Sequence, residues 1–370
     1  MKVLDSTPPA ARDGAVEKLL PSLVRAARRE PVEVTPVWFM RQAGRSLPEY
    51  RAIRERYDIL AICESPELCL EVTLQPVRRL RVDAAVLFAD IMLPVMFGLG
   101  VEVRLVENVG PVVDAPIREV ADLSRLQAVP AEQAMPFVLE TVRLLRRALE
   151  PERAVIGFAG APFTLAGYLI EGRPSRDFLI TKRLMHGSPD LWHGLMDRLT
   201  AMVTDYLRAQ ARAGADILQL FDSWVGCLSP HDYRAGVYPY MERIFEALRA
   251  DGIPAIHFGT GTAGILPAMV AAGGDVIGLD WRVDLGQTWE EVIGPGRGVQ
   301  GNLDPSVLLS PWAVVEQETR RILDGVNHRP GHIFNLGHGV HQETPVDHVR
   351  LMVDLVHELS DRRMAGDSLS

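Results

Sequence analysis

The sequence has few cysteines, no long apolar run and no excess of positive charge. Its three cysteines, Cys63, Cys69 and Cys227, form an odd number without the spacing of metal ligands. We therefore expect reduced thiols rather than a disulfide framework. No apolar run approaches the roughly 20 residues that cross a bilayer, and residues 1–20 lack the apolar core of a signal peptide. These absences predict a cytoplasmic protein that does not act on a membrane.

The charge balance narrows the choice of ligand. The formal net charge of −9 at pH 7 argues against binding to nucleic acid or to membrane surfaces. An anionic small molecule is still compatible, because a concave site can be locally positive. Hydrophobic residues make up 47% of the chain, which is enough for a large core.

Short apolar runs alternate with longer helical patterns along the chain. Eight runs predict strands, at residues 37–40, 84–89, 154–158, 216–221, 254–258, 276–279, 298–301 and 332–335. Most are separated by enough residues for a crossover helix, and no linker divides the chain. This pattern predicts the α/β class and a single (β/α)8 TIM barrel, with its active site at the C-terminal ends of the strands. We assign residues 21–362 to the barrel domain, residues 1–20 to a loosely ordered leader and residues 363–370 to a flexible tail.

Local signals place several helix starts and one insertion. Ser65 before Pro66 is typical of an N-cap, and Pro76 predicts a kink or a break in the helix that follows. By the same reasoning Asp304-Pro305 and Thr344-Pro345 would open the last two helices. Residues 101–105 and 112–113 flank a turn and predict a hairpin beside the mouth of the barrel.

Polar residues follow most of the predicted strands, where a barrel carries its chemistry. In chain order they are Arg41 and Arg45, Asp90, Tyr168, Asp222 and Ser223, His257, Asp280, Asn302 and His338. Each has a structural alternative. Asp90 and Ser223 could cap helices, Tyr168 could pack at the rim, His338 could occupy a turn, and Asp222 and Asp280 could make structural hydrogen bonds.

No metal site is expected. His338 and His341 have three-residue spacing, but no carboxylate or cysteine partner accompanies them. Gly259 stands where a His-x-Cys zinc site starting at His257 would need a thiolate. The glycine-rich segment 259–264 lacks the Lys of a Walker motif, and we interpret it as a loop where backbone approaches a bulky ligand.

Five segments together closely resemble the uroporphyrinogen decarboxylase family. They are residues 36–54 (PVWFMRQAGRSLPEYRAIR), 88–94 (FADIMLP), 157–172 (GFAGAPFTLAGYLIEG), 218–224 (LQLFDSW) and 335–341 (NLGHGVH). The resemblance runs from about residue 30 to about residue 360. It implies a cofactor-free barrel enzyme of haem biosynthesis, commonly a homodimer, that removes the four acetate carboxylates of uroporphyrinogen III to give coproporphyrinogen III and carbon dioxide.

The resemblance also implies which residues contact the tetrapyrrole. Carried over by motif, they are Arg41, Gln42, Ala43, Gly44, Arg45, Arg54, Asp90, Tyr168, Ser223 and His338. Arg41, Arg45 and His338 would match the acidic arms, with Tyr168 and Ser223 as neutral donors. Asp90 would accept from the pyrrole N–H groups and stabilise the cation that forms when a ring carbon is protonated. Candidate proton donors are Arg41, His338 or a water held by Tyr168, and pKa matching favours His338.

Two other functions stay open from the sequence. A zinc-dependent corrinoid or thiol methyltransferase of the same barrel superfamily would need the missing thiolate, and tightly bound zinc would reveal it. A non-catalytic tetrapyrrole carrier could share the binding residues, but it would not release carbon dioxide from uroporphyrinogen.

Overall fold

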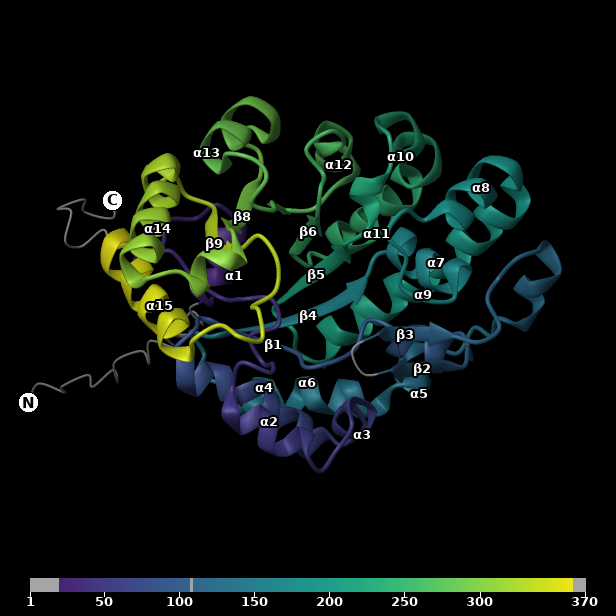
Figure 1. The fold of residues 1–370 in the computed structure, drawn as a ribbon, viewed down its shortest axis with the longest axis horizontal. Coiled ribbons are helices and arrows are strands. Elements are labelled where there is room, and N and C mark those ends of the chain that lie inside the picture. The colour runs from purple at the N-terminus through teal and green to yellow at the C-terminus, as the bar shows by residue number, and fades with distance from the viewer. Residues whose placement is uncertain (1–19, 107–108, 362–370) are drawn as a thin grey trace, which may run out of the picture.

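The computed structural model describes residues 20–106 and 109–361. The predicted tail and all but the last residue of the predicted leader lie outside these ranges. Seven parallel strands form one curved sheet with neighbours in the order β1-β4-β5-β6-β7-β8-β9 (Figure 1). Their bounds are β1 (Ala84–Val86), β4 (Ala154–Gly160), β5 (Ile217–Asp222), β6 (Ala255–Gly259), β7 (Val276–Gly278), β8 (Gly298–Leu303) and β9 (His332–Leu336). Each overlaps one of the predicted strands.

Residues 36–38 occupy the eighth position and connect the two edges of this sheet. Val37 forms a parallel bridge with Phe334 of β9, and its carbonyl accepts from the N–H of Asp83, just before β1, at 2.8 Å. The strand predicted at residues 37–40 is therefore wrong in length, because a single bridge replaces it. The N–H of Gln42 bonds to the carbonyl of Phe39 at 3.2 Å, so the chain turns away before a ladder can extend. The predicted barrel is confirmed.

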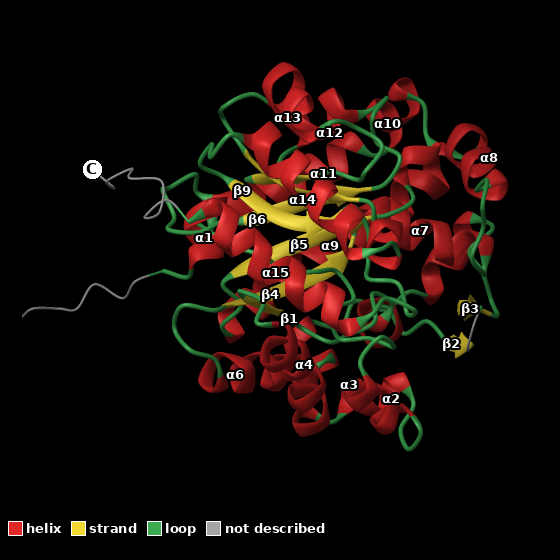
Figure 2. Cartoon of the chain, turned by 60° about the vertical axis from the view of Figure 1, so that its left-hand side comes forward, coloured by secondary structure: helices red, strands yellow, loops and turns green. Residues whose placement is uncertain are grey.

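The helices surround the sheet in both views (Figures 1 and 2). Seven longer ones are α4 (Pro66–Leu80), α6 (Pro136–Ala148), α7 (Pro162–Glu171), α9 (Pro189–Ala213), α11 (Tyr238–Ala250), α14 (Trp312–Val326) and α15 (Val346–Ser360). The shorter α-helices are α1 (Ser22–Ala27), α2 (Pro48–Arg54), α3 (Ile59–Glu64), α5 (Ala131–Ala134), α8 (Leu179–Gly187), α10 (Pro230–Gly236), α12 (Leu266–Ala272) and α13 (Leu285–Thr288). Five 3-10 or π segments are η1 (Pro94–Gly98), η2 (Val120–Arg125), η3 (Val225–Cys227), η4 (Trp289–Ile293) and η5 (Pro305–Leu309). None of the helices in residues 20–106 and 109–361 is long and apolar enough to cross a membrane.

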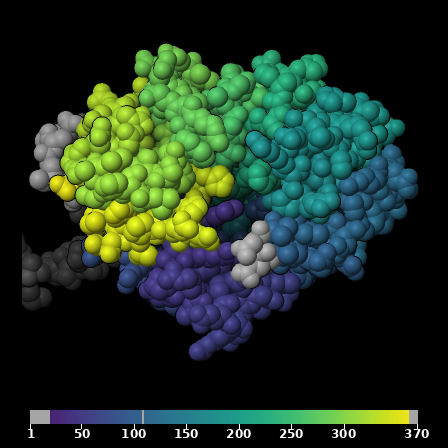
Figure 3. Space-filling view, in the orientation of Figure 1, coloured from purple at the N-terminus to yellow at the C-terminus, as the bar shows by residue number. Residues whose placement is uncertain are grey.

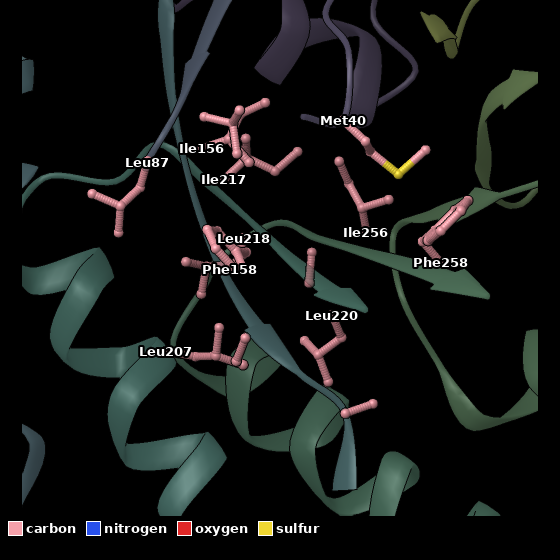
Figure 4. Close-up of a cluster of buried hydrophobic side chains, with 14 of the residues drawn as sticks. Met40, Leu87, Ile156, Phe158, Leu207, Ile217, Leu218, Leu220, Ile256 and Phe258 are labelled. Atoms are coloured by element: carbon pink, nitrogen blue, oxygen red, sulfur yellow. The ribbon is translucent and has the colours of Figure 1, made fainter. Parts of the chain in front are cut away.

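Apolar side chains from the strands and from α9 form the core. Figure 4 shows Ile156, Ile217 and Ile256 from neighbouring strands together with Leu87, directly after β1, and Leu207 of α9. The interior of the barrel also holds polar groups in β8, the strand with the weakest apolar content. Gln300 accepts from the indole N–H of Trp38 and donates to Gln219, both at 2.9 Å. Because these buried amides are hydrogen-bonded, the strand can stay fully buried.

The predicted helix starts are confirmed in part. Ser65 accepts from the N–H of Leu68 and caps α4, and α4 continues through Pro76, so the predicted break does not occur. Pro76 is buried with the apolar face of the helix, and the alternative expectation of a kink at this residue stays a prediction. Asp304 opens only η5, since α14 begins at Trp312 after Pro311, and α15 has no side-chain cap from Thr344.

The predicted hairpin is present. β2 (Val103–Val106) pairs with β3 (Gly110–Val113) in an antiparallel manner. Figure 2 shows the pair at the periphery, apart from the main sheet. Residues 107 and 108 of its turn lie outside the described residues.

Candidate active site at the strand ends

The candidate residues lie beyond the C-terminal ends of parallel strands, so the sheet carries them to one end of the barrel. Arg41 follows the Val37 bridge and Asp90 follows β1. Tyr168 lies on α7 after β4, Ser223 directly follows β5, and His338 is the second residue after β9. Figure 3 shows a hollow at the centre of one face, where the purple, teal and yellow segments of the chain meet.

The loop that carries Arg41 is held rigidly. Arg41 adopts a left-handed conformation (φ 58°), and a Cβ at Gly44 would come 2.8 Å from the Arg41 carbonyl oxygen, so glycine is required there. The buried Gln42 side chain accepts from the N–H of Phe39 and donates to the carbonyl of Ala84 in β1. Gln42 therefore anchors the loop to the sheet, and Arg41 is the side chain that the loop presents.

Asp90 occupies a partly buried position near Arg41 and Tyr168. Its Oδ1 accepts from the N–H of Met92 at 2.9 Å within a turn, whereas η1 that follows begins after Leu93 without a side-chain cap, so Asp90 does not cap a helix. Burial raises the pKa of Asp90 above its usual range, and the Met92 N–H and the Arg41 charge oppose that rise. A buried carboxylate stays ionised only when hydrogen-bond donors or positive charges, here the Met92 N–H and Arg41, lie close to it. It can accept further hydrogen bonds from a ligand.

Tyr168 stays protonated at neutral pH. Burial raises the pKa of Tyr168 and the Asp90 carboxylate raises it further, against Trp224 and Arg41. Its ring packs edge-on against Trp224, with centroids 6.2 Å apart. The phenol is therefore a neutral group near Asp90 that can donate a hydrogen bond, and its predicted contact with a substrate stays a prediction. Trp224 was not among the predicted residues, although it lies next to Ser223 in the sequence.

A buried carboxyl group lies one residue before Ser223. Asp222 Oδ1 accepts from the Thr164 hydroxyl at 3.2 Å, and the Thr164 oxygen accepts from the N–H of Trp224 at 3.4 Å. Burial raises the pKa of Asp222 to about 7. These bonds join the loop of Ser223 to α7, the helix of Tyr168. This geometry therefore favours a structural hydrogen-bonding role for Asp222 over contact with a ligand.

His338 is neutral in this site. Its Nδ1 accepts from the N–H of Gly339 at 2.7 Å, which leaves the ring proton on Nε2. Burial lowers the pKa of His338 to about 4, Arg41 and Arg282 lower it further, and Asp280 opposes them. His338 can thus donate a hydrogen bond from Nε2, but at neutral pH it is not the cation that its usual pKa would allow.

Arg45 and Arg54 lie near the phenol of Tyr50 at the rim. Burial raises the pKa of Tyr50, and Arg54 and Arg45 oppose it. Arg45 also donates to Gln342 at 3.4 Å, and Arg54 donates to the carbonyl of Tyr57 at 2.6 Å. The Tyr50 ring packs on Phe88, two residues before Asp90, with centroids 5.6 Å apart. This contact connects both rim arginines to the segment of Asp90.

Two residues at predicted strand ends do not contribute to the opening. The ring of His257 packs against Phe245 of α11, and its Nδ1 lies 3.3 Å from the carbonyl of Gly273, so it faces the outer helices. Asn302 donates to the carbonyls of Asp280 and Val283, and it is therefore structural. Within residues 20–106 and 109–361, no three His, Cys, Asp or Glu side chains are grouped closely enough to hold a metal ion.

Comparisons of the sequence agree with one another. The family model described as uroporphyrinogen decarboxylase matches residues 20–359. A uroporphyrinogen decarboxylase from Thermus thermophilus is 55% identical over 338 residues, which cover 91% of this chain and 98% of that protein. Another from Carboxydothermus hydrogenoformans is 50% identical over 339 residues, covering 92% and 96% of the two chains.

Solved structures agree on the fold. A methyltransferase from Methanosarcina mazei superposes with a TM-score of 0.76 at 21% identity, covering 91% of this chain and 98% of that one. A B12-independent methionine synthase from Shewanella superposes with a TM-score of 0.55 at 13% identity, covering 84% and 92%. At these identities the similarity concerns the fold alone.

Proposed function

This chain belongs to the uroporphyrinogen decarboxylase family and is a carboxy-lyase, and we propose that its barrel mouth converts uroporphyrinogen III to coproporphyrinogen III and carbon dioxide. The observation that carries the proposal is the position of Asp90. This partly buried carboxylate lies near Arg41 and the phenol of Tyr168, and Arg41 in turn lies near the neutral imidazole of His338. A purely anion-binding site would not include it.

Uroporphyrinogen is an electron-rich macrocycle with acidic arms around a core of pyrrole N–H groups. Guanidinium groups bind carboxylates in a bidentate way, so Arg41, Arg45 and Arg54 are assigned to the acidic periphery. Tyr168, Ser223 and the Nε2–H of His338 add neutral donors. The backbone at Ala43 and Gly44 lets the ligand approach the Arg41 loop closely, and Gln42 supports that loop from behind.

Asp90 is assigned to the pyrrole nitrogens. When a ring carbon is protonated, the pyrrole becomes a cationic electron sink. The bond between the acetate methylene and its carboxylate then breaks, its electrons form an exocyclic alkene, and carbon dioxide leaves. Protonation of that alkene gives the methyl group, and loss of the ring proton restores the pyrrole. Ionised Asp90 stabilises the cation more than the neutral ground state, as catalysis requires.

Three groups in the proposed active site are candidates for the proton donor. His338 is neutral in the free site, so it is a weak acid there, although a bound carboxylate would raise its pKa. Arg41 lies near both Asp90 and His338. We assign both residues to the catalytic group, with a water held by Tyr168 as the remaining source of the proton.

The test is turnover of uroporphyrinogen by Asp90→Asn under anaerobic conditions. The amide keeps the shape but loses the charge, so we expect a loss of about 100-fold or more in kcat. The matched control is Asp284→Asn, which changes an exposed cap of α13. Turnover near that of the unchanged enzyme would contradict the electrostatic role, and binding without carbon dioxide release by the unchanged enzyme would favour a carrier.

We also propose that residues 21–362 act as one catalytic unit, that the enzyme works in the cytoplasm, and that it forms a homodimer. The family resemblance supports the last two points, and the odd number of cysteines agrees with a reducing compartment. Light scattering of the purified chain tests the dimer, since a monomer mass at micromolar concentration would exclude it.

A further inference from the structure

We propose that Arg282, on the loop after β7, is a further substrate-binding residue that receives a peripheral carboxylate of the tetrapyrrole. This proposal rests on the proposed function, because it concerns the same opening. Arg282 was not among the residues expected from the sequence.

Two contacts fix the guanidinium group of Arg282. Its Nη1 donates to Oδ2 of Asp280 at 2.6 Å, and the group stacks over the Trp281 ring at 4.2 Å from the centroid. Asp280 is almost fully buried, whereas the side chain of Arg282 is 51% exposed. One edge of the Arg282 guanidinium group is therefore held by Asp280, and much of the side chain is still exposed to solvent. A preordered fork loses less entropy when it binds a carboxylate.

The loop at residues 337–339 places Arg282 beside the candidate site. A Cβ at Gly337 would come 2.5 Å from the backbone nitrogen of Trp281, and a Cβ at Gly339 would come 2.5 Å from Cδ of Arg41. The loop is thus packed between Trp281 on one side and Arg41 on the other. Both guanidinium groups lower the pKa of His338, which agrees with their closeness to its ring. His338 therefore has a positive charge on each side of its loop, from Arg41 and from Arg282.

The structural alternative is that Arg282 only neutralises Asp280. The Asp280 carboxylate already accepts from two backbone N–H groups, those of Gly261 at 2.6 Å and Arg282 at 3.0 Å. Such bonds stabilise a buried carboxylate without a side-chain cation. The guanidinium group thus adds a positive charge at the mouth of a site whose ligand is a polyanion.

The experiment compares Arg282→Gln with the unchanged enzyme in anaerobic turnover of uroporphyrinogen. Loss of one charge-assisted hydrogen bond predicts a rise in KM of about 10-fold. We expect kcat to change less than about twofold, because the group acts on binding rather than on the reacting atoms. Arg282→Lys should restore part of the affinity. The matched control is Arg320→Gln, an exposed arginine of α14 that also pairs with a carboxylate.

A second variant separates substrate binding from the neutralisation of Asp280. The double variant Asp280→Asn/Arg282→Gln leaves no unpaired buried charge. We expect it to keep the high KM of Arg282→Gln. A KM that returns to the unchanged value would overturn the proposal, as would an unaltered KM in Arg282→Gln alone. If the unchanged enzyme releases no carbon dioxide, the proposed function itself fails. That outcome differs from the two KM results that would overturn the role of Arg282 alone.

Discussion

Arg41 and Gly339 pack so closely that a Cβ atom at position 339 would lie 2.5 Å from Cδ of Arg41. The two residues come from opposite ends of the chain, one after the Val37 bridge and one after β9. The N–H of Val340 also donates to the carbonyl of Met40 at 2.9 Å. The last loop of the barrel therefore sets the position of the first arginine.

Gly339→Ala should displace the Arg41 side chain and lower stability slightly. A Cβ at position 339 would meet Cδ, Cγ and Cβ of Arg41 at 2.5, 2.8 and 3.1 Å, so the side chain must change rotamer and the two loops must move apart slightly. We expect a loss of about 10- to 100-fold in kcat/KM, since small misplacements at a reacting centre are costly. Steady-state turnover measures the change in kcat/KM, and denaturant unfolding measures the change in stability. Gly296→Ala is the control, because Gly296 lies in an exposed turn and no atom lies within 4 Å of a Cβ there.

Arg41→Lys should keep the positive charge and remove the planar fork. If Arg41 makes a bidentate contact with a carboxylate, we expect a loss of about 1.5–3 kcal/mol in transition-state binding, or roughly 10- to 100-fold in kcat/KM. Arg78→Lys, at an exposed pair with Glu71, should leave the rate unchanged. If Arg41→Lys and Arg78→Lys have the same kcat/KM, a positive charge without the planar guanidinium group is sufficient at position 41.

The acid limb of the pH profile should report Asp90. Burial raises its pKa in the free enzyme, so protonation on acidification removes the reactive form at a higher pH than for an ordinary aspartate. Pyrrole N–H donors favour the ionised form and lower the pKa in the complex. The acid limb of kcat should therefore lie at lower pH than that of kcat/KM. Coincident limbs would argue against contact between Asp90 and the pyrrole nitrogens.

Asp222 should make stability depend on pH in a defined direction. Its folded pKa of about 7 lies above the unfolded value, so the folded state binds the extra proton. The stability that this proton supplies is complete below about pH 4 and is lost as pH rises through about 7. Asp222→Asn should remove this dependence and raise the free energy of unfolding at pH 8 by about 2–4 kcal/mol relative to the unchanged chain. Urea titrations of both proteins at pH 5 and pH 8 measure the free energy of unfolding. If the difference in this energy between pH 5 and pH 8 is the same in Asp222→Asn as in the unchanged chain, Asp222 is not a buried protonated carboxyl.

Six of the seven strand positions were predictable because they are short apolar runs between helical patterns, and burial on both faces requires that composition. The seventh, β8, has a weaker apolar signal, and its place followed from the spacing of its neighbours. The first strand was predicted too long, since the left-handed backbone of Arg41 and the turn at Phe39 depend on contacts with β1 and β9. The helix start at Asp304 was wrong for a similar reason. A capping residue fixes only the first turn, and here that turn is η5.

The candidate site was predictable as far as its residues follow strands, because strand ends meet at one end of a barrel. The sequence could not show which way those side chains point. His257 faces the outer helices, and Gln42 faces the sheet. Trp224 was not predicted because its place depends on packing against Tyr168, which is distant in the sequence. The position of Arg282 beside His338 also depends on the packing of the 337–339 loop against Trp281. The low pKa of His338 likewise comes from burial and from arginines that are distant in the sequence.

The most direct test of the proposed mechanism is a crystal structure of this enzyme with coproporphyrinogen bound. We expect the pyrrole nitrogens to face Asp90, with nitrogen-to-oxygen distances of about 2.7–3.2 Å, and the propionates to contact the arginines at the mouth. A product bound with its pyrrole nitrogens turned away from Asp90 would contradict the account.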